Sequence, residues 1–497
     1  MPSESNTFDL VVIGAGPGGY TAAICAARAG MSCALVESEA NLGGVCLNWG
    51  CIPTKSLLRA AEVYGLVREA DEFGLQVQGV DADWDRVMAR SRRVPDELAA
   101  GVAGLMAKHQ VTVFRGAGRL SPTRHVEVRD AQGGVQATLS ATHILLATGG
   151  RPRDLPGVEI DGDRVWSSRH ALEAASCPES LGIVGAGPVG VEFACFFAAF
   201  GCQVTLIEAA DQVLPNEDPE IARTLEKALV DQGIDVLLGA QVAAASPVDA
   251  AEPDSDVPGS PGVRLDLGRG VGPASQGSGP AAPGAAPDQV PDAVTAERAL
   301  IAAGVTGNTE GLGLEALGIR PQGGAVPVDE CFRTSVPGVY AVGDLIGPPQ
   351  LAHAAAAEAR LAVAAMGGAT RARQDRSRVP RCVYSQPQVA SVGLTEAAAR
   401  EQGEIRVGRF PFASSGLGRA VGTTQGLVKL VFGARYGELQ GAAIVGPEAT
   451  ELIAELGLAL ALEATWEELA DTVHAHPTLS EAVMEAAAAA FDRAVNI

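Results

Sequence analysis

The chain has 497 residues and a formal net charge of −22, and 47% of its residues are hydrophobic. At about 100–200 residues per domain, this length predicts three or four domains, each with its own core. The acidic balance argues against a nucleic-acid binder, because such proteins need a basic face to meet phosphates. We also expect no membrane contact and a cytoplasmic location, since the sequence shows neither a long uncharged apolar run nor a signal peptide.

An internal repeat is the first strong pattern along the chain. Residues 9–37 and 181–208 each read as an apolar strand, a glycine turn, an Ala-rich helix and a second apolar strand that ends in an acid. Each copy therefore predicts a βαβ unit. The corresponding glycines and acids are Gly14, Gly16, Gly19 and Glu37 in the first copy, and Gly185, Gly187, Gly190 and Glu208 in the second.

The spacing G-x-G-x-x-G in this context predicts a dinucleotide site in each copy. The first glycine allows a tight turn, the second lets the backbone approach a pyrophosphate, and the third lets helix and strand pack closely. Glu37 and Glu208 stand where an acid would hydrogen-bond a ribose hydroxyl. Because Glu208 would repel a 2′-phosphate and Ala209 and Ala210 supply no arginine, the second site should prefer NAD over NADP. The first site could hold either carrier of ADP-ribose.

Two of the nine cysteines, Cys46 and Cys51, stand in a distinctive segment that reads GGVCLNWGCIPTKSLL from Gly43 onward. In a regular α-helix, residues five apart are separated by about 7.5 Å along the axis, whereas a disulfide requires Cα atoms within about 6.8 Å. The pair can therefore bond only if the backbone between them is irregular, which Gly43, Gly44 and Gly50 permit. The other seven are expected to be ordinary buried thiols: Cys25, Cys33, Cys177, Cys195, Cys202, Cys331 and Cys382.

The rest of the chain alternates strands with glycine turns before its pattern changes. Ala141–Gly150 predicts a buried strand that ends in a glycine turn at Thr148 and Gly149, and Glu297–Gly304 repeats this pattern. Residues 245–292 are rich in Pro, Gly, Ala, Asp and Ser, which predicts a flexible surface excursion. The further expected segments are a linker at Arg151–Pro156, a strand at Val263–Leu267 inside the excursion, a strand at Val339–Asp344, a helix at Leu351–Ala365, a strand-rich pattern from Val379 and helices from Thr450.

The cysteine segment and the segment HAHPTLSE at residues 474–481 resemble the redox-active disulfide and the catalytic histidine motif of flavoprotein pyridine nucleotide-disulfide oxidoreductases. Together with Glu208, they resemble most the dihydrolipoyl dehydrogenases of that family. The resemblance covers nearly the whole chain except the excursion. It implies FAD at the first site, NAD at the second, and an α/β fold with two Rossmann-like βαβ dinucleotide-binding domains plus an α+β C-terminal dimerisation domain. The implied domains are 1–152 for FAD, 153–303 for NAD with the excursion at 245–292, 304–375 for a return to the FAD or central domain, and 376–497 for dimerisation.

The resemblance also implies a role for each site residue, and no metal site. Cys46 would exchange with the substrate dithiol, and Cys51 would lie against the flavin. His476 would take the proton from the dithiol at the disulfide of the other subunit of a homodimer, and Glu481 would orient it. His474 reads as a structural histidine. The implied cofactor-binding positions outside the repeat are Lys55 near the flavin and paired with Glu192, Gly118 beside Glu37 at the adenosine half of FAD, Thr148, Gly149 and Gly304 in glycine turns, Asp344 at the ribityl or pyrophosphate group, and Ala352 and His353 at the isoalloxazine edge.

The implied reaction is the oxidation of protein-bound dihydrolipoamide, with electrons passing from the Cys46–Cys51 pair through FAD to NAD⁺. The expected partner is the dihydrolipoyl domain of a 2-oxo acid dehydrogenase complex. The chain departs from the family at one point: the usual G-R-x-P-N reads Gly304-Val305-Thr306-Gly307-Asn308, without the arginine and the proline. This departure could change either the binding of NAD or the hinge to the next domain.

Other functions remain open from the sequence. A mercuric reductase-like enzyme would need a C-terminal cysteine pair, and residues 477–497 contain no cysteine. A glutathione-type reductase would need an arginine-lined NADP site. A reductase of another low-molecular-weight disulfide stays open, as does a non-catalytic FAD-binding scaffold subunit. The intact set Cys46, Cys51, Lys55, His476 and Glu481 argues against the scaffold.

Overall fold

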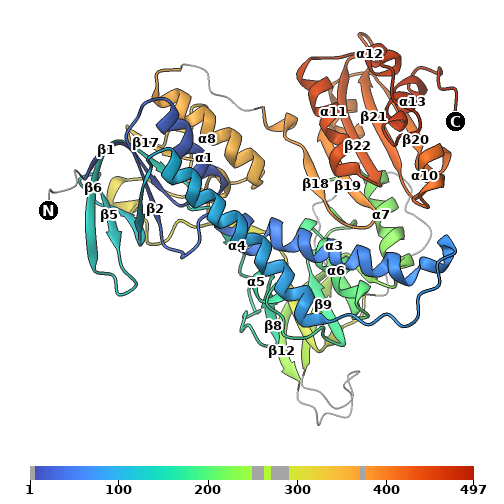
Figure 1. The fold of residues 1–497 in the computed structure, drawn as a ribbon, viewed down its shortest axis with the longest axis horizontal. Helices are drawn as coiled ribbons and strands as arrows, with labels where there is room; N and C mark the ends of the chain where they lie inside the picture. The colour runs from blue at the N-terminus through green and yellow to red at the C-terminus, as the bar shows by residue number, and fades with distance from the viewer. Residues whose placement is uncertain (1–5, 249–261, 270–289, 370–374, 497) are drawn as a thin grey trace. The chain divides into compact units, whose positions relative to one another are not determined.

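The computed structural model describes residues 6–248, 262–269, 290–369 and 375–496. The chain divides into two compact units (Figure 1). The first consists of Met1–Leu57, Asp85–Arg153 and Gly304–Gln374, and the second of Leu58–Trp84, Asp154–Ala303 and Asp375–Ile497. The four domain ranges given above stay predictions.

The first unit is built on a seven-stranded sheet in the order β3-β2-β1-β6-β5-β4, with β17 also paired to β6. Strands β1, β2, β3, β6 and β17 run parallel, and β4 and β5 join them as an antiparallel hairpin. Parallel strands are covered on both faces, which is why their sequences are continuously apolar. The strands are β1 (Thr7–Ile13), β2 (Cys33–Glu37), β3 (Thr112–Arg115), β4 (Ala117–Leu120), β5 (Val126–Arg129), β6 (Val135–Leu146) and β17 (Val339–Ala341).

Helices α1 (Pro17–Arg28) and α8 (Ala352–Met366) lie side by side on this sheet (Figure 1). Both helices carry completely buried alanines, whose small side chains let the two backbones approach closely: Ala22, Ala23 and Ala26 in α1, and Ala359 and Ala362 in α8. The unit also contains α2 (Gly44–Trp49), the start of α3 (Cys51–Arg68) and most of α4 (Trp84–Lys108). A small antiparallel pair, β7 (Gly150–Pro152) with β16 (Val305–Gly307), closes it.

The second unit begins with a five-stranded parallel sheet in the order β11-β10-β9-β15-β8. Its strands are β8 (Val165–Ser167), β9 (Ser180–Val184), β10 (Gln203–Glu208), β11 (Asp235–Leu238) and β15 (Arg298–Ile301), and its helices are α5 (Ser168–Ala171), α6 (Pro188–Ala199) and α7 (Pro219–Asp231). A three-stranded antiparallel sheet follows, formed by β12 (Ala240–Val248), β13 (Gly262–Arg269) and β14 (Ala293–Ala296).

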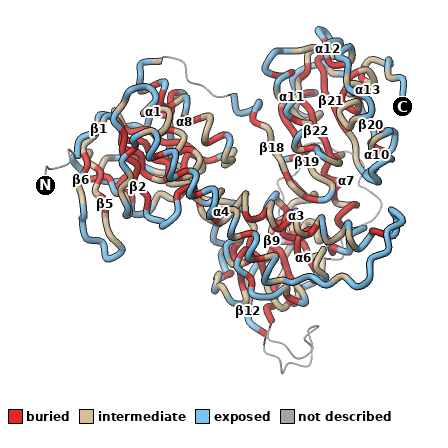
Figure 2. Tube along the Cα trace, viewed as in Figure 1, coloured by how far each residue is buried: buried red, intermediate tan, exposed pale blue. Residues whose placement is uncertain are grey.

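The C-terminal part of the second unit is an antiparallel sheet in the order β18-β19-β22-β21-β20. Helix α11 packs against β19 and β22, and α13 packs against β20. Figure 2 shows the buried residues concentrated in the strands of each sheet. The elements are β18 (Arg381–Val383), β19 (Gln388–Gly393), β20 (Ile405–Pro411), β21 (Leu427–Gly433), β22 (Leu439–Gly446), α9 (Glu396–Gln402), α10 (Gly416–Ala420), α11 (Ala449–Ala461), α12 (Trp466–Asp471) and α13 (Glu481–Ala489).

The predicted α/β fold class is confirmed, as are both βαβ repeats. The elements predicted at Glu297–Gly304, Val339–Asp344 and Leu351–Ala365 match β15, β17 and α8 to within three residues at each end. The strand predicted at Ala141–Gly150 is misplaced, because β6 begins six residues earlier, at Val135, and ends at Leu146. The excursion at 245–292 is predicted too long, because residues 245–248 complete β12, while Val263–Leu267 lies in β13 as expected. Its remaining stretches, 249–261 and 270–289, lie outside the described residues. The predicted linker Arg151–Pro156 is also partly wrong, since its first two residues belong to β7.

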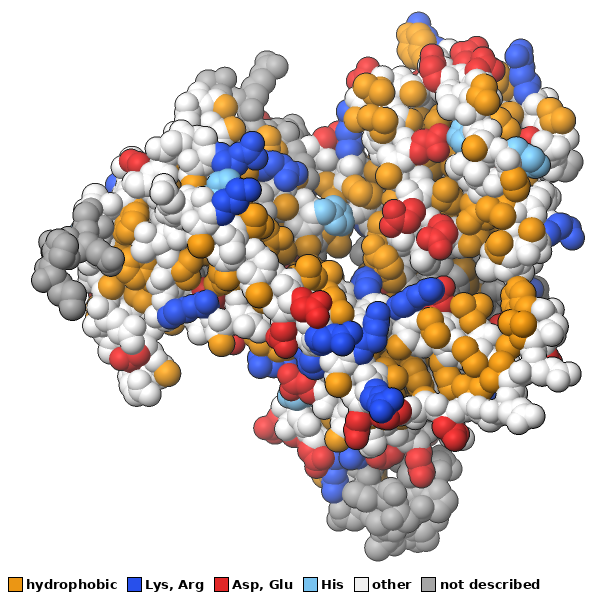
Figure 3. Space-filling view, viewed as in Figure 1, with side chains coloured by type: hydrophobic (Ala, Val, Ile, Leu, Met, Phe, Trp, Pro, Cys, Tyr) orange, Lys and Arg blue, Asp and Glu red, His pale blue; other side chains and the backbone are white. Residues whose placement is uncertain are grey.

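The surface carries charges of both signs: on the face drawn in Figure 3, basic and acidic side chains occur together. Within the described ranges, no helix is both long and apolar enough to cross a membrane.

Candidate functional site

In the first glycine turn, between β1 and α1, packing requires glycine at two of the three positions but not at the third. A Cβ on Gly14, whose φ is 100°, would lie 2.3 Å from the carbonyl oxygen of Ala147, and a Cβ on Gly19 would lie 1.8 Å from the carbonyl oxygen of Gly14. Both positions therefore exclude any side chain. At Gly16 the nearest atom is 3.8 Å away, on Gly44. The space above Gly16 and the uncapped N-terminus of α1 suit a pyrophosphate.

The second glycine turn, between β9 and α6, repeats this geometry. Gly185 has φ 105°, and a Cβ there would lie 2.6 Å from the carbonyl oxygen of Ala302. A Cβ on Gly190 would lie 1.9 Å from the carbonyl oxygen of Gly185. A Cβ on Gly187 would have no non-neighbouring heavy atom of the described chain within 4 Å. The residues of both turns therefore fit a dinucleotide.

The acid that ends the second strand of each repeat accepts a hydrogen bond from the backbone of its glycine turn. The N–H of Ala15 donates to Glu37 Oε2 over 2.7 Å, and that of Ala186 donates to Glu208 Oε2 over 2.8 Å. The other carboxylate oxygen accepts a second N–H two residues after each acid. Each carboxylate thus lies at the turn with backbone bonds on both oxygens, which places it beside the space that a dinucleotide would occupy.

The cysteine segment is attached to the first glycine turn. The N–H of Gly43 donates to the carbonyl oxygen of Ala15 over 2.9 Å, and a Cβ on Gly44 would lie 2.6 Å from the Cα of Gly16. Gly43 caps α2 with φ 112°, a conformation that favours glycine. Helix α2, which carries Cys46, therefore starts in contact with the turn.

The predicted irregularity between Cys46 and Cys51 is confirmed. Helix α2 ends at Trp49, α3 begins at Cys51, and Gly50 between them has φ −143° and ψ −112°. Both cysteines are half-buried thiols in this structure. Their side chains are hydrogen-bonded to each other, and this bond, followed by burial, raises the pKa of Cys46, while Lys55 acts in the opposite direction. The two sulfurs therefore lie close enough to interact directly, with Lys55 near them.

Asp344, like Lys55, is a charged group that acts on Cys46. It lies in the 3-10 helix Gly343–Ile346 that follows β17. Burial raises its pKa, and its charge acts on Cys46. Gly118 in β4 is required by packing, since a Cβ there would lie 2.7 Å from Cγ2 of Ile13. Ala352 and His353 form the first turn of α8.

The departure at Val305-Thr306-Gly307 has a local structural explanation. The segment forms β16 and pairs with β7, and the N–H of Gly307 donates to the carbonyl oxygen of Gly324 over 3.1 Å. A proline has no N–H to make this bond, and a Cβ at Gly307 would lie 2.5 Å from the same oxygen. Thr148 and Asn308 also exchange two side-chain bonds of 2.9 Å across the pair. The backbone at Gly307 is therefore held in contacts that only glycine can make. The positive φ of 102° at Gly304, directly before β16, also favours glycine.

The C-terminal histidine motif lies in the second unit. His476 Nδ1 is 2.8 Å from Glu481 Oε1, and the imidazole is 77% exposed. The other carboxylate oxygen of Glu481 accepts the N–H of Thr478 over 2.8 Å. That N–H and then His476 hold the pKa of Glu481 below its usual range. An ionised Glu481 thus orients a ring whose Nε2 edge is accessible.

His474 differs from its neighbour in burial and partners. Its side chain is 5% exposed, with Nε2 2.9 Å from Glu455 Oε1 and Nδ1 2.9 Å from the carbonyl oxygen of Thr472. Its expected structural role agrees with these contacts. Glu192 is buried in α6 and accepts the N–H of Tyr384 over 3.0 Å. Because Lys55 and Glu192 belong to different units, their pairing stays a prediction.

The seven remaining cysteines are less uniform than expected. Cys33, Cys195, Cys202 and Cys331 are buried, but Cys25, Cys177 and Cys382 are only partly buried. The prediction of buried thiols is therefore wrong for these three. Among the described residues, no group of three or more His, Cys, Asp or Glu side chains is placed to hold a metal ion.

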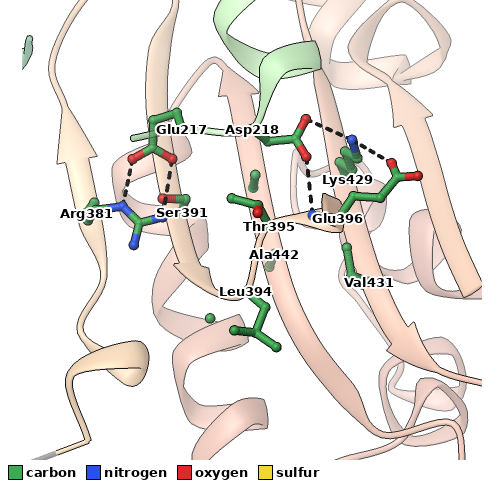
Figure 4. Close-up of a pocket in the computed structure, with 12 residues that line it drawn as sticks. Glu217, Asp218, Arg381, Ser391, Leu394, Thr395, Glu396, Lys429, Val431 and Ala442 are labelled. Carbon is green, nitrogen blue, oxygen red and sulfur yellow. Dashed lines mark hydrogen bonds and ion pairs between the residues drawn. The ribbon is translucent and has the colours of Figure 1, made fainter. Parts of the chain in front are cut away.

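A charged pocket in the second unit was missed from the sequence. It is lined by the segment before α7 and by strands of the C-terminal sheet (Figure 4). Lys429 Nζ lies 2.8 Å from Asp218 Oδ1 and 2.9 Å from both Glu220 Oε2 and Glu396 Oε2. Arg381 pairs with Glu217 at 2.7 Å on the other side of the pocket. Because these charges are paired with one another, we interpret them as ion pairs that stabilise the packing of the two segments.

The fold and the dithiol beside a dinucleotide turn define a class of redox flavoprotein. The chain belongs to the pyridine nucleotide-disulphide oxidoreductase family: residues 8–359 match the family model, and residues 379–487 match the model of its dimerisation domain. It is an oxidoreductase that depends on FAD and NAD. The dimerisation domain supports a homodimer.

Relatives extend this similarity over the whole chain. A protein of Chlorobaculum parvum named dihydrolipoyl dehydrogenase is 44% identical over 489 residues, which cover 98% of each chain. One of the same name from Zymomonas mobilis is 42% identical over 494 residues, covering 98% of this chain and 99% of the relative. The crystal structure of LpdA from Mycobacterium tuberculosis superposes with a TM-score of 0.84 at 27% identity, covering 96% of this chain and 98% of that one. The suspected family is confirmed.

Proposed function

We propose that this chain is a dihydrolipoyl dehydrogenase, which oxidises protein-bound dihydrolipoamide to lipoamide and reduces NAD⁺. The observation that carries the proposal is the contact between the dithiol and the first glycine turn. Gly43 and Gly44, which start the cysteine helix, touch Ala15 and Gly16 of that turn. A redox pair fixed to a dinucleotide turn can pass electrons to the dinucleotide bound there. The relatives named above support the choice of substrate.

Each cofactor has a set of residues to hold it. Gly14, Gly16 and Gly19 with Glu37 would hold the ADP half of FAD, with Gly118, Thr148, Gly149, Asp344, Ala352 and His353 along the rest. Gly185, Gly187 and Gly190 with Glu208 would hold NAD, with Gly304 at the hinge. FAD, when bound, supplies a two-electron acceptor.

The chain's own residues carry out the thiol chemistry. In the oxidised enzyme, a substrate thiolate attacks the sulfur of Cys46, the Cys46–Cys51 bond breaks, and the sulfur of Cys51 leaves as a thiolate. The second substrate thiol then displaces Cys46 and forms the product disulfide. His476 accepts the substrate protons at Nε2, because Glu481 holds Nδ1. The division between the two sulfurs agrees with the raised pKa of Cys46.

The same proposal includes two partners. A second copy of the chain would bring its His476 to the dithiol, which suits the exposure of that ring. The lipoyl-bearing domain of a 2-oxo acid dehydrogenase complex would deliver the substrate.

The test is an assay of the purified protein with a panel of substrates. We expect a yellow protein that reduces NAD⁺ with dihydrolipoamide, at least tenfold slower with NADP⁺, as an order-of-magnitude expectation for a carboxylate facing a 2′-phosphate. Glutathione disulfide and Hg²⁺ with NADH should give little turnover. The variant Cys51→Ser should lose the activity, while the matched variant Cys25→Ser, on α1 of the same unit, should keep it. A colourless protein, or full activity in Cys51→Ser, would contradict the proposal.

A further inference from the structure

A second cysteine pair lies in the five-stranded sheet of the second unit, apart from the site described above. Strands β9 and β10 are parallel neighbours, with Ser180 opposite Gln203. The N–H of Gln203 donates to the carbonyl oxygen of Glu179 over 2.9 Å. Cys177 stands two residues before Glu179, and Cys202 directly precedes Gln203. The sheet therefore brings these two cysteines together although 24 residues separate them in the sequence.

The two side chains are in direct contact. A hydrogen bond joins the thiols of Cys177 and Cys202, and the backbone N–H of Cys202 also bonds to the sulfur of Cys177. Cys202 is 6% exposed, whereas Cys177 is only partly buried. One sulfur of the pair is therefore within reach of a small solute, and the other is shielded behind it.

The protons are divided unequally between the sulfurs. The bond from Cys202 lowers the pKa of Cys177 against the effect of burial, whereas the same bond and burial raise the pKa of Cys202. Glu297 raises both. Cys177 is thus the sulfur that loses its proton first, and Cys202 keeps its own. Where one of two neighbouring cysteines is accessible and the other is shielded, the accessible sulfur is the one oxidised first and the shielded one resolves it.

We propose that Cys177 and Cys202 form a second redox-active pair, which a hydroperoxide converts to a disulfide. The thiolate of Cys177 attacks the peroxide oxygen, the O–O bond breaks, and with one proton the products are a sulfenic acid on Cys177 and water (or an alcohol from an organic hydroperoxide). The thiol of Cys202 then attacks that sulfur, an S–S bond forms, and a second water leaves. Two electrons pass from the pair to the peroxide.

The position of the pair predicts the effect of a disulfide bond between Cys177 and Cys202. Both cysteines lie where β9 and β10 begin, whereas the glycine turn and Glu208 lie where these strands end. A bond there would enclose β9, the turn and α6 in one loop without covering the turn. Closure is therefore expected to stabilise the sheet and to leave the binding of NAD unchanged. The proposal does not depend on the function proposed above.

The experiment uses the full-length, FAD-loaded protein with its thiols reduced. Hydrogen peroxide is added in stoichiometric steps, free thiols are blocked with N-ethylmaleimide, and non-reduced peptides are identified by mass spectrometry. We expect a peptide linked through Cys177 and Cys202. In Cys202→Ser, dimedone should label Cys177 as a sulfenic acid, and in Cys177→Ser, Cys202 should be recovered as a free thiol. Both variants should keep the basal activity of the wild-type enzyme.

Cys195 is the internal control, since burial raises its pKa to about 11. Iodoacetamide at neutral pH should modify Cys177 at least about tenfold faster than Cys195. The thermal midpoint of the oxidised protein should rise by a few degrees, and that of peroxide-treated Cys202→Ser should not. Recovery of both cysteines as free thiols at a peroxide dose that closes Cys46–Cys51 would overturn the proposal. So would the absence of a dimedone adduct in Cys202→Ser.

Discussion

Lys429 Nζ lies 2.8 Å from Asp218 Oδ1, and both side chains are only 4% exposed. Asp218 caps α7 by accepting the N–H of Glu220, and Lys429 stands in the middle of β21. The pair therefore connects β21 of the C-terminal sheet to the N-terminus of α7 within the second unit, and it does so with buried charges.

Replacing Lys429 with Met should destabilise the protein strongly. The variant would leave the carboxylates of Asp218, Glu220 and Glu396 facing one another without a buried cation, which should cost about 3–5 kcal/mol. The measurement is the free energy of unfolding of the second unit in urea. The matched control is Arg400→Gln, whose partner is also Glu396 but whose side chain is 60% exposed. It should cost less than about 1 kcal/mol. Equal losses in the two variants would contradict this account.

The same cluster predicts a loss of stability in acid. Burial would raise the pKa of Glu396, but hydrogen bonds from Lys429 and Arg400 outweigh it and set the pKa at about 2, below the ordinary 4.5. Because the pKa is lower in the folded state, the contribution is complete above about pH 4.5 and is lost as the pH falls toward 2. Unfolding free energies measured across this window should fall more steeply for the wild type than for Lys429→Met. Parallel curves would rule out the cluster as the source.

The two glycines of the second turn should respond differently to alanine. Gly187 has φ −73° and open space, so Gly187→Ala should keep the fold and raise the KM for NAD⁺ by at least about tenfold, since the methyl group enters the pyrophosphate space. Gly190→Ala would place a Cβ 1.9 Å from the carbonyl oxygen of Gly185 and should lower the melting temperature. Thermal unfolding and steady-state kinetics separate the two effects. An unchanged KM in a folded Gly187→Ala protein would argue against NAD in this turn.

Removing the proposed base should affect turnover without affecting the fold. His476→Gln should lower kcat for dihydrolipoamide by about 10²–10⁴-fold, the range for a lost general base. Glu481→Gln should have a smaller effect, because the ring remains but its orientation and charge support weaken. His474→Gln is a poor control because its ring is only 5% exposed. His109→Gln serves instead, since His109 is only partly buried and lies outside the site. The measurement is kcat against pH, with the flavin spectrum as the check on folding.

A mixed dimer should recover activity from two inactive variants if His476 acts on the dithiol of the other subunit. One parent carries Cys51→Ser and the other His476→Gln, and the two are unfolded and refolded together. A hybrid has one site with both an intact dithiol and an intact histidine, so part of the wild-type rate should return. No recovery, despite hybrids verified by mass spectrometry, would place base and dithiol in the same chain.

The sequence predicted those features that depend on local patterns. The two βαβ repeats followed from apolar strands and glycine spacing, and the break at Gly50 followed from the conflict between helical rise and disulfide length. The Cys46–Cys51 pair was found because its neighbours are distinctive.

Features that depend on the meeting of distant segments were not predicted. Lys429 and Asp218 are 211 residues apart, and no local pattern joins them. Cys177 and Cys202 were interpreted as ordinary thiols, because their pairing depends on the register of β9 with β10, which a sequence does not specify. The role of Gly307 was visible only as a departure, since the carbonyl of Gly324 that makes glycine necessary lies 17 residues away.

Glu208 has two tasks at once, and this limits how the enzyme's coenzyme preference could change. Its carboxylate is expected to refuse a 2′-phosphate, and it also accepts the N–H groups of Ala186 and Ala210 that hold the turn in shape. A single substitution to arginine, made to admit a phosphorylated coenzyme, would release both amides together. An evolutionary path from one coenzyme to the other would therefore pass through a less ordered turn that binds either coenzyme poorly. The alternative is that another side chain first takes over as acceptor for these two N–H groups.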